Sequence, residues 1–512
     1  MYTGEMEAFY FYIPLTFLAI YAITDYFLRK FQNLPPRPWL PPLPIIGHLY
    51  LLKRPLHKSL AKISAKYGPV QLLQIGSRRV LVVSSPSAAE ECLTKNDIIF
   101  ANRPRQLLAG KYLGYNYDSL VYAPYGDHWR NLRRVTTLEI LSSHRLREFE
   151  PIRADEVRLM IRKLYRSWSG EAVEVQVNAM LIDLTLNAVM RMVSGKRYYY
   201  GKDDILTDEE KEKAHRFQKI VEEVFCAMSV SHIGDYLPIL RWLGVSKLEK
   251  QLIALQAKRD LFMKELVEEI RCSMKNSGKR NMIQVLLSLQ QTEPEFYTDE
   301  MIRSIMLTIL AGGTHTSICT LEWAMSLLVN NPSVLKKAHN EIDSHVGQGR
   351  CVEESDMVNL PYLACIIKET LRMYPAGPLL PHESSKDCMV SGYHVPRGTM
   401  LLVNAWGIQN DPNIWGDPET FRPERFEGVE VYGDGFKLLP FGFGRRSCPG
   451  ENMAMRMVGL ALGSLIQCFE WGRTSDTKVD MNGGIGIALA KTIHLVAMCQ
   501  PRPIMLNLLS QL

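Results

Sequence analysis

The segment Pro440-Phe441-Gly442-Phe443-Gly444-Arg445-Arg446-Ser447-Cys448-Pro449-Gly450 decides the interpretation of this 512-residue chain. It is a glycine-rich loop with one cysteine and two arginines, and a helix is predicted to begin near Glu451. Backbone amides, a helix N-terminus and positive charge each lower the pKa of a thiol, so this setting favours a thiolate. A thiolate is suited to bind a soft metal such as haem iron. Taken alone, however, a single cysteine in a loop is usually just a small buried residue.

The spacing within this loop is more specific than its composition. It follows the pattern F-x-x-G-x-R-x-C-x-G, with Phe441, Gly444, Arg446, Cys448 and Gly450 at the fixed positions. This pattern resembles the haem-ligand signature of the cytochrome P450 superfamily. The resemblance implies that the thiolate of Cys448 is the axial ligand of haem b iron and that Arg446 contacts a haem propionate.

Two further motifs contain paired charges. Glu369 and Arg372 are three residues apart, so they share a helix face, and such pairs are usually solvated surface pairs. They resemble the family's E-x-x-R pair, and Pro423-Glu424-Arg425-Phe426 resembles its arginine-bearing loop. By that resemblance, Glu369, Arg372 and Arg425 form a buried charge triad with a structural role.

Three more residues are expected to bind haem. Trp129 and Arg133 are four residues apart and face the same way on a helix, which alone indicates only an amphipathic helix. In the family a W-x-x-x-R pair binds a haem propionate. His382 stands where many relatives have a propionate-binding basic residue.

Adjacent glycines interrupt a long apolar helix in Ala311-Gly312-Gly313-Thr314-His315-Thr316-Ser317. Each glycine costs about 1 kcal/mol relative to alanine in a helix, which suggests close packing or an opening toward a ligand. The segment resembles the family's oxygen-binding groove, and Thr316 matches the threonine that directs proton delivery. His315 occupies the place of the usual acid. Either it relays protons in that acid's place, since histidine titrates near neutrality, or it points away and water carries them.

The start of the chain predicts a membrane anchor. Residues 8–23 are almost wholly apolar, and residues 1–30 are long enough to cross a bilayer as a helix. An acidic leading flank and the basic residues that follow favour an uncleaved anchor with a cytosolic body over a signal peptide. The proline-rich residues 31–45 predict a stiff hinge. We therefore expect an endoplasmic reticulum protein with a single-pass anchor that contacts membrane lipid.

The composition is that of a globular protein, with 46% hydrophobic and 22% charged residues. The net charge of +6 is too small for so long a chain to indicate nucleic-acid binding. Ten cysteines without a C-x-x-C pair fit neither a disulfide scaffold nor a zinc cluster.

The periodicity of the sequence predicts a mainly α fold with small β-sheets (α+β), in which residues 46–512 form one large haem-enclosing domain. The expected helices and strands lie at Leu56–Tyr67, Val70–Ile75, Arg79–Ser84, Glu210–Val230, Leu248–Met274, Thr298–Asn330 and Glu451–Phe469.

The residues of these motifs resemble those of plant microsomal members of the family, in the branch that hydroxylates isoflavones, lignans and triterpenes. That resemblance implies a monooxygenase that uses O2 and electrons from NADPH through a flavoprotein reductase, with Lys437 and Arg445 near the docking face. The reductase, a lipophilic small-molecule substrate and membrane lipid are the expected partners, and nucleic acid is not.

The expected substrate pocket is large, neutral and lipophilic. Its walls are the 103–125 loop, a lid at residues 217–240, the long helix and the Gly483–Ile487 turn. The residues expected to line it are Leu107, Leu108, Tyr112, Leu113, Tyr117, Ile309, Gly312, Leu379, Leu380 and Ile485.

Alternative functions remain open at this level. The same fold could couple phenols or close a methylenedioxy bridge. Rearrangement of lipid hydroperoxides is disfavoured, because the cysteine loop is uninterrupted and Thr316 is present. No feature supports a haem carrier or sensor.

Overall fold

The computed structural model describes most of the chain. It covers residues 42–512 apart from 106–107, 199–206, 229–235, 238–245, 275–280, 429–434 and 487, together with residues 12, 16–17, 19–20, 23–24, 26–27 and 29–39. Predicted residue Leu107 and part of the predicted lid lie outside the described residues.

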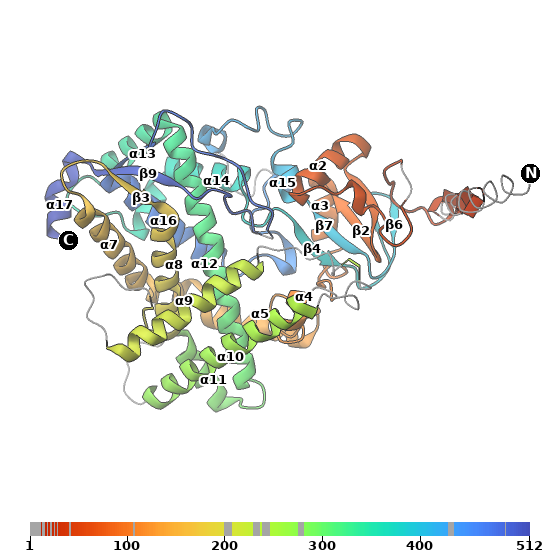
Figure 1. Cartoon of the computed structure of the whole chain (residues 1–512), viewed down its shortest axis with the longest axis horizontal. Coiled ribbons are helices and arrows are strands. Elements are labelled where there is room, and N and C mark those ends of the chain that lie inside the picture. The colour runs from red at the N-terminus through yellow and green to blue at the C-terminus, as the bar shows by residue number, and fades with distance from the viewer. Residues whose placement is uncertain are drawn as a thin grey trace, which may run out of the picture.

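Helices form most of the molecule (Figure 1). Those before the central helix are α2 (Leu56–Tyr67), α3 (Pro86–Leu93), α4 (Leu108–Tyr112), α5 (Asp127–Val135), α6 (Ser143–Glu148), α7 (Glu150–Ser167), α8 (Val177–Ser194), α9 (Asp208–Met228), α10 (Ser246–Ser273) and α11 (Met282–Thr292). The central helix and those after it are α12 (Asp299–Asn330), α13 (Pro332–His345), α14 (Pro361–Met373), α15 (Ala405–Gln409), α16 (Glu451–Cys468) and α17 (Leu506–Gln511).

Three small sheets accompany the helices in the part of the chain that the structure describes. The largest has the strand order β1-β2-β7-β4 and is antiparallel except for the parallel pair β2–β7. Its strands are β1 (Val70–Ile75), β2 (Arg78–Val83), β7 (Met400–Val403) and β4 (Leu380–Glu383). The second is antiparallel, in the order β3 (Val173–Gln176), β9 (Val496–Pro501) and β8 (Phe469–Gly472), and the third pairs β5 (Cys388–Val390) with β6 (Tyr393–Val395). The predicted mainly α fold with small sheets is confirmed.

The central helix α12 runs through the middle of the helical part (Figure 1). The hydroxyl of Thr298 caps its start by accepting a hydrogen bond from the backbone N–H of Met301 at 3.2 Å. Its 32 residues span about 48 Å at 1.5 Å per residue. The helix packs against α8, α16, α10 and α14, so most of its surface is core. Within the described residues α12 is the one helix long and apolar enough to span a membrane, and 67% of its apolar window is buried, as in the core of a globular protein.

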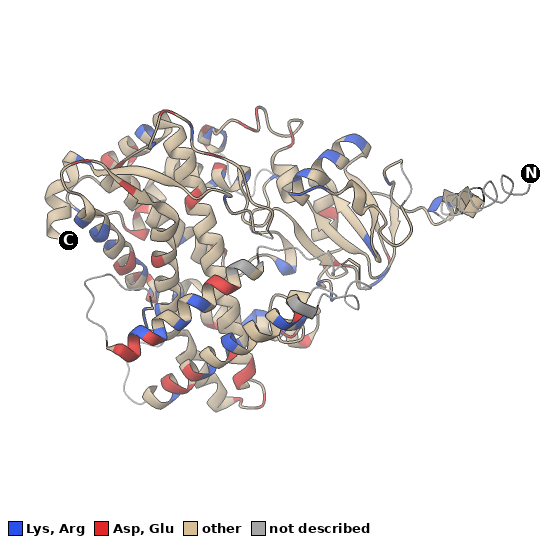
Figure 2. Cartoon of the chain, in the orientation of Figure 1, with Lys and Arg blue, Asp and Glu red and all other residues tan. Residues whose placement is uncertain are grey.

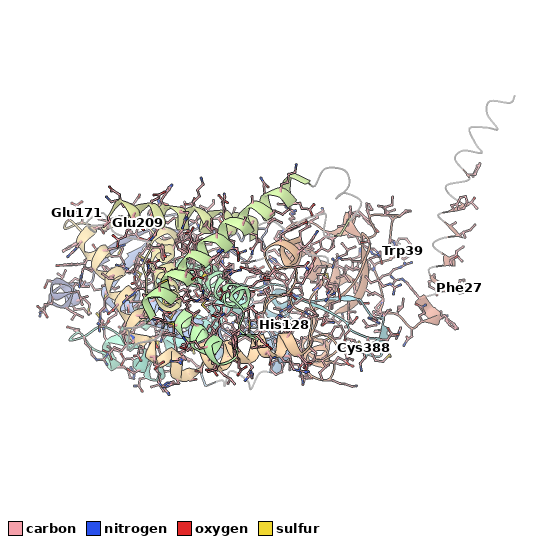
Figure 3. The ribbon with its side chains drawn as sticks, turned by 90° about the horizontal axis from the view of Figure 1, so that it is seen from below. Phe27, Trp39, His128, Glu171, Glu209 and Cys388 are labelled. Atoms are coloured by element: carbon pink, nitrogen blue, oxygen red, sulfur yellow. The ribbon has the colours of Figure 1, made fainter. Side chains whose placement is uncertain are left out.

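The beginning of the chain differs from this core. Its described apolar side chains are exposed, and Phe17, Phe27 and Phe31 have exposed fractions of 70%, 63% and 92%. The segment that carries Phe27 projects from the body (Figures 1 and 3). Acidic and basic residues of the body are interspersed along the helices around α9 and α10 (Figure 2).

Candidate active site

A cavity of about 650 Å³ lies between the loop that carries Cys448 and the middle of α12. Ligand sites in proteins commonly have roughly 300–1,000 Å³ and mainly apolar walls. The walls here are mainly apolar as well. They include Leu108, Leu113, Leu120, Val121, Leu252, Leu307, Ile309, Leu379, Leu380, Met400, Leu402, Phe441, Met453 and Ile485.

The loop geometry presents Cys448 to this cavity. The backbone N–H of Cys448 donates to the carbonyl of Phe441 at 2.8 Å, which closes the loop. Gly444 has a φ of +73°, and a Cβ there would lie 2.6 Å from the carbonyl oxygen of Leu93, so the loop requires glycine. Gly450 caps α16 and lies directly beside the thiol. The thiol of Cys448 is exposed, and the space it faces is the cavity.

The pKa of Cys448 differs from the sequence-based expectation. Although the thiol is open to the cavity, desolvation by the protein around it raises its pKa, and the backbone amides of Gly450 and Glu451 and the charge of Arg133 act to lower it. The stabilising groups expected from the loop are therefore present, but desolvation outweighs them. A metal would have to supply the remaining stabilisation of a thiolate.

Three buried or half-buried arginines surround the same end of the cavity. The guanidinium of Arg446 donates to the carbonyls of Ala101, Leu120 and Ala123, and burial together with Arg103 and Arg133 lowers its pKa to about 9. Arg133 donates to the carbonyl of Ser447 at 2.6 Å and to its hydroxyl at 3.3 Å. Arg103 donates to the carbonyl of Pro381, and burial lowers its pKa to about 10.

None of these three guanidiniums has a carboxylate within ion-pair distance among the described residues. A buried cation without an anion is costly, so this end of the cavity is complementary to an anionic ligand. A soft thiol donor beside this cationic end fits a haem, which has a metal at its centre and carboxylates at one edge.

Trp129 and His382 complete this end of the cavity. The indole N–H of Trp129 donates to the carbonyl of Leu120 at 3.0 Å, and the Arg446 guanidinium lies 4.2 Å from the centre of the Trp129 ring. His382 is buried, and its Nδ1 lies 2.9 Å from the carbonyl oxygen of Phe100. Burial and the charge of Arg103 hold the pKa of His382 well below its usual value, so this imidazole is neutral at physiological pH.

The helix α12 contributes Gly312, Gly313 and Thr316 to the same cavity as Cys448. A Cβ at Gly312 would meet nothing within 4 Å, so the helix opens to the cavity at this point. A Cβ at Gly313 would instead lie 2.7 Å from the methyl carbon of Met453. The hydroxyl of Thr316 donates to the carbonyl of Gly312 at 2.6 Å and keeps its lone pairs at the cavity wall.

His315 is not part of the cavity lining. Its Nε2 lies 3.8 Å from the sulfur of Cys319, which is one turn further along α12. Burial lowers the pKa of His315, and the nearby Glu322 partly offsets this. Of the two orientations considered from the sequence, the structure has the one in which the ring points away from the cavity.

The charged triad lies outside the cavity. Nε of Arg372 donates to Glu369 at 2.7 Å, its second nitrogen donates at 2.9 Å, and Nε of Arg425 donates to the same carboxylate at 3.2 Å. The side chains of Glu369 and Arg372 have no exposed surface. The structure therefore brings together the three residues of the predicted triad.

Most of the predicted pocket residues line the cavity, namely Leu108, Leu113, Ile309, Gly312, Leu379, Leu380 and Ile485. Tyr112 and Tyr117 do not. Tyr112 lies under the ammonium of Lys111, 4.8 Å from the ring centre. Tyr115, Asn116 and Tyr117 have φ values of +52°, +52° and +68°, and this left-handed turn folds the ring of Tyr117 back against Gly110. From the predicted lid, Val224, Ala227 and Tyr236 reach the cavity, whereas Phe217 is packed in the core.

The lining also includes polar residues that were not expected individually, among them Arg103, Ser119 and Arg259. Arg103 and Ser119 belong to the 103–125 loop that was expected to form a wall, but nothing in the sequence marks either side chain as facing the cavity. Arg259 belongs to a helix rich in charged residues, where an arginine is usually solvated. Only the packing of α10 against α4 and α12 shows that Arg259 faces the interior of the protein.

Comparison with known proteins agrees with this geometry. Residues 36–496 match the family model described as "Cytochrome P450". The chain is 50% identical to "Cytochrome P450 81Q32" of Catharanthus roseus (94% of each chain covered), 48% identical to "(+)-piperitol/(+)-sesamin synthase" of Sesamum radiatum (99% of each), and 46% identical to "Isoflavone 2'-hydroxylase" of Glycyrrhiza echinata (98% of each). A solved zebrafish cytochrome P450 structure with abiraterone has the same fold, with a TM-score of 0.72 at 24% identity over 87% of this chain and 99% of the other.

Proposed function

Because the chain belongs to the cytochrome P450 family, we propose that this monooxygenase hydroxylates a lipophilic plant specialised metabolite of the triterpene, isoflavonoid or lignan type. The enzyme uses haem b and O2, and it receives electrons from NADPH through a flavoprotein reductase. The observation that carries the proposal is the Cys448 thiol, which opens into an apolar cavity opposite Thr316.

The residues around the cavity have separate roles in this proposal. Bound haem supplies the activation of O2 that places one oxygen atom in a C–H bond. Cys448 would hold its iron, and Arg446, Arg133, Trp129 and His382 would orient it, with Arg103 as a further cation. The aliphatic walls exclude water and position the substrate. The hydroxyl of Thr316 holds a proton at Oγ1 within the cavity wall.

Two measurements test this proposal in sequence. The reduced carbon-monoxide difference spectrum of the purified holoenzyme should show the long-wavelength band typical of thiolate ligation. A Cys448→Ala variant should lose that band, whereas Cys272→Ala, which removes an exposed cysteine on α10, should keep it. Folded, haem-loaded wild-type protein without the band would contradict the assignment of Cys448.

The second measurement concerns the substrate. Microsomes that contain the enzyme and its reductase should convert at least one member of a panel of isoflavones, lignans and triterpenes, with NADPH required and a mass increase of one oxygen atom. A complete lack of NADPH-dependent products across the three classes would contradict the proposed substrate range.

A second candidate reaction is closure of a methylenedioxy bridge or another oxidative coupling. It is favoured by the relative from Sesamum radiatum, which is named as a synthase and is 48% identical over 99% of this chain. The same microsomal assay separates the two reactions, because bridge closure removes two hydrogen atoms from the substrate and adds no oxygen.

For the location, we propose an endoplasmic reticulum protein in which residues 1–30 are the anchor, 31–45 the hinge and 46–512 the cytosolic catalytic domain. The exposed phenylalanines near the start support an anchor. The hinge is tied to the body, because the backbone N–H of Leu72 donates to the carbonyl of Pro36 at 2.9 Å and that of His394 to Asn33 at 2.9 Å. Removal of residues 2–30 should release the protein from membranes in alkaline extraction, and its full retention would contradict the anchor.

Reductase docking is proposed for the surface near the Cys448 loop. Lys437 is exposed there. Arg445 is less available, because its guanidinium is bonded to Asp97 at 2.5 Å and lies 3.3 Å from the hydroxyl of Tyr125.

A further inference from the structure

Arg259 is a buried cation in the wall of the cavity. It lies on α10, its exposed fraction is 6%, and it lines the same cavity as Cys448 and Thr316. Its guanidinium donates to the side-chain oxygen of Gln256 at 3.1 Å, which satisfies one of its five N–H groups with a neutral acceptor.

The nearest carboxylate is already engaged by other residues. One oxygen of Asp260 accepts a hydrogen bond from the hydroxyl of Tyr115 at 2.5 Å and from Nε of Arg303 at 2.8 Å. No ion pair between Arg259 and a carboxylate is present among the described residues. Asp260 and Arg303 neutralise each other, so the positive charge of Arg259 remains without an anion at the cavity wall.

A second polar group of the wall also lacks a partner. The hydroxyl of Ser119 is buried, lines the cavity and has no hydrogen-bond partner in the described structure. Ser119 is in the loop between Tyr115 and Tyr122, and Arg259 lies close enough to both tyrosines to interact with them electrostatically. Arg259 and Ser119 therefore belong to the same side of the cavity.

Arg259 does not belong to the group of arginines near Cys448, although the 119–123 loop borders both, since Leu120 and Ala123 accept hydrogen bonds from Arg446. The cations of that group influence one another, since Arg103 and Arg133 both act on Arg446. The charges that act on Arg259 are those of Tyr115, Tyr122 and Asp260, and burial lowers its pKa. Arg259 is thus a further cation in the mainly apolar wall.

A buried guanidinium without an anionic partner lowers the stability of the protein unless a ligand pairs with it. The planar guanidinium pairs best with an oxyanion that can accept two hydrogen bonds. We propose that Arg259, assisted by the hydroxyl of Ser119, binds an acidic oxygen of the substrate, such as a carboxylate or an ionised phenol. The inference rests on the proposed function and narrows it: the substrate is a lipophile that carries an acidic group.

The test compares probes that differ only in that acidic group. The holoenzyme is titrated with dodecanoic acid and methyl dodecanoate, and with 7-hydroxyisoflavone and 7-methoxyisoflavone, by ligand difference spectra and by equilibrium dialysis. Wild type is expected to bind the acidic member of a pair at least about tenfold more tightly, as for a charge-assisted hydrogen bond.

Variants connect this preference with the two residues. Arg259→Gln should reduce the preference to less than about twofold, Arg259→Lys should retain part of it, and Ser119→Ala should weaken it less than Arg259→Gln does. Arg271→Gln is the matched control, because Arg271 is on the same helix but pairs with Glu268 and Asp299 outside the cavity. It should bind as wild type does.

Equal binding of both members of each pair by wild type, or an unchanged preference in Arg259→Gln, would overturn the inference. The carbon-monoxide spectrum of each variant reports separately on haem ligation. A normal spectrum without an acid preference contradicts only the role of Arg259, whereas an absent thiolate band in wild type contradicts the proposed function.

Discussion

Two groups of arginines lie deep in this protein, and they are satisfied in different ways. Arg372 and Arg425 share the carboxylate of Glu369, outside the cavity. Arg446 and Arg103, at the cavity, are bonded to backbone carbonyls. A carboxylate within the chain pairs with both arginines of the first group, so its role is complete when the protein folds. The second group retains its charge for an external anion. The hydrogen-bond partner of a buried arginine thus indicates whether the arginine has a structural role or binds a ligand.

The largest effect is expected on the stability of the protein, when an ion pair of the first group is removed. Arg372→Leu leaves the fully buried Glu369 with Arg425 as its remaining cation, which should cost about 3–5 kcal/mol of the free energy of unfolding. Lys337→Ala is the control, because this lysine pairs with Glu424 and Glu427 at the surface, where a pair contributes about 0–1 kcal/mol. Urea unfolding of both variants measures the difference. Equal losses of stability would contradict the buried role of the triad.

Loss of an arginine from the second group should weaken the retention of haem. Arg446→Gln should speed the transfer of haem to apomyoglobin by about tenfold or more, because a charged hydrogen bond to a carboxylate is lost. The neighbouring Arg445→Gln should change this rate little, since Arg445 pairs with Asp97 outside the cavity. If both variants lose haem at the same rate, the distinction between the two groups of arginines fails.

Residues that line the cavity can also be compared with residues that do not on the helix α12. Thr316→Val removes the hydroxyl that lies in the wall, and the ratio of product formed to NADPH consumed should fall by about tenfold or more, while Thr316→Ser should retain most of it. Thr308→Val is a matched control. Thr308 also lines the cavity, and its hydroxyl makes the same bond to the carbonyl four residues earlier, at 2.8 Å. An equal fall in both valine variants would assign the effect to the lining rather than to Thr316.

The smallest effect is expected for His315, which is next to Thr316 on α12 but is not among the residues that line the cavity. His315→Asp should leave the ratio of product to NADPH within about twofold of wild type, because the ring lies beside Cys319 and outside the cavity lining. A clear rise or fall of this ratio would show that His315 takes part in proton delivery despite its orientation.

The parts of this structure that follow from short segments could be predicted from the sequence. The helix predicted at Leu56–Tyr67 has those bounds, and the one predicted to run from Thr298 to Asn330 begins at Asp299 with Thr298 as its cap. The loop at Cys448 was recognisable for the same reason, since its glycines, its cysteine and the helix after it are adjacent in the chain.

The cavity wall was harder to predict because it depends on packing between distant segments. Tyr117 was expected to line the pocket, but a left-handed turn carries its ring to Gly110. Arg259 was missed because its neighbours along α10 are solvated charges, and its burial results from α4 and α12. The pKa of Cys448 was misjudged for a related reason, because the local sequence shows the amides that lower it but not the burial that raises it.

The contact of Gly313 with Met453 has a consequence for the shape of the cavity. A Cβ at position 313 would lie 2.7 Å from the methyl carbon of Met453, which belongs to the helix that follows Cys448. One absent methyl group therefore sets how closely α12 approaches α16 beside the cavity. A larger residue at this position would push the two helices apart and change the space available to any molecule bound there.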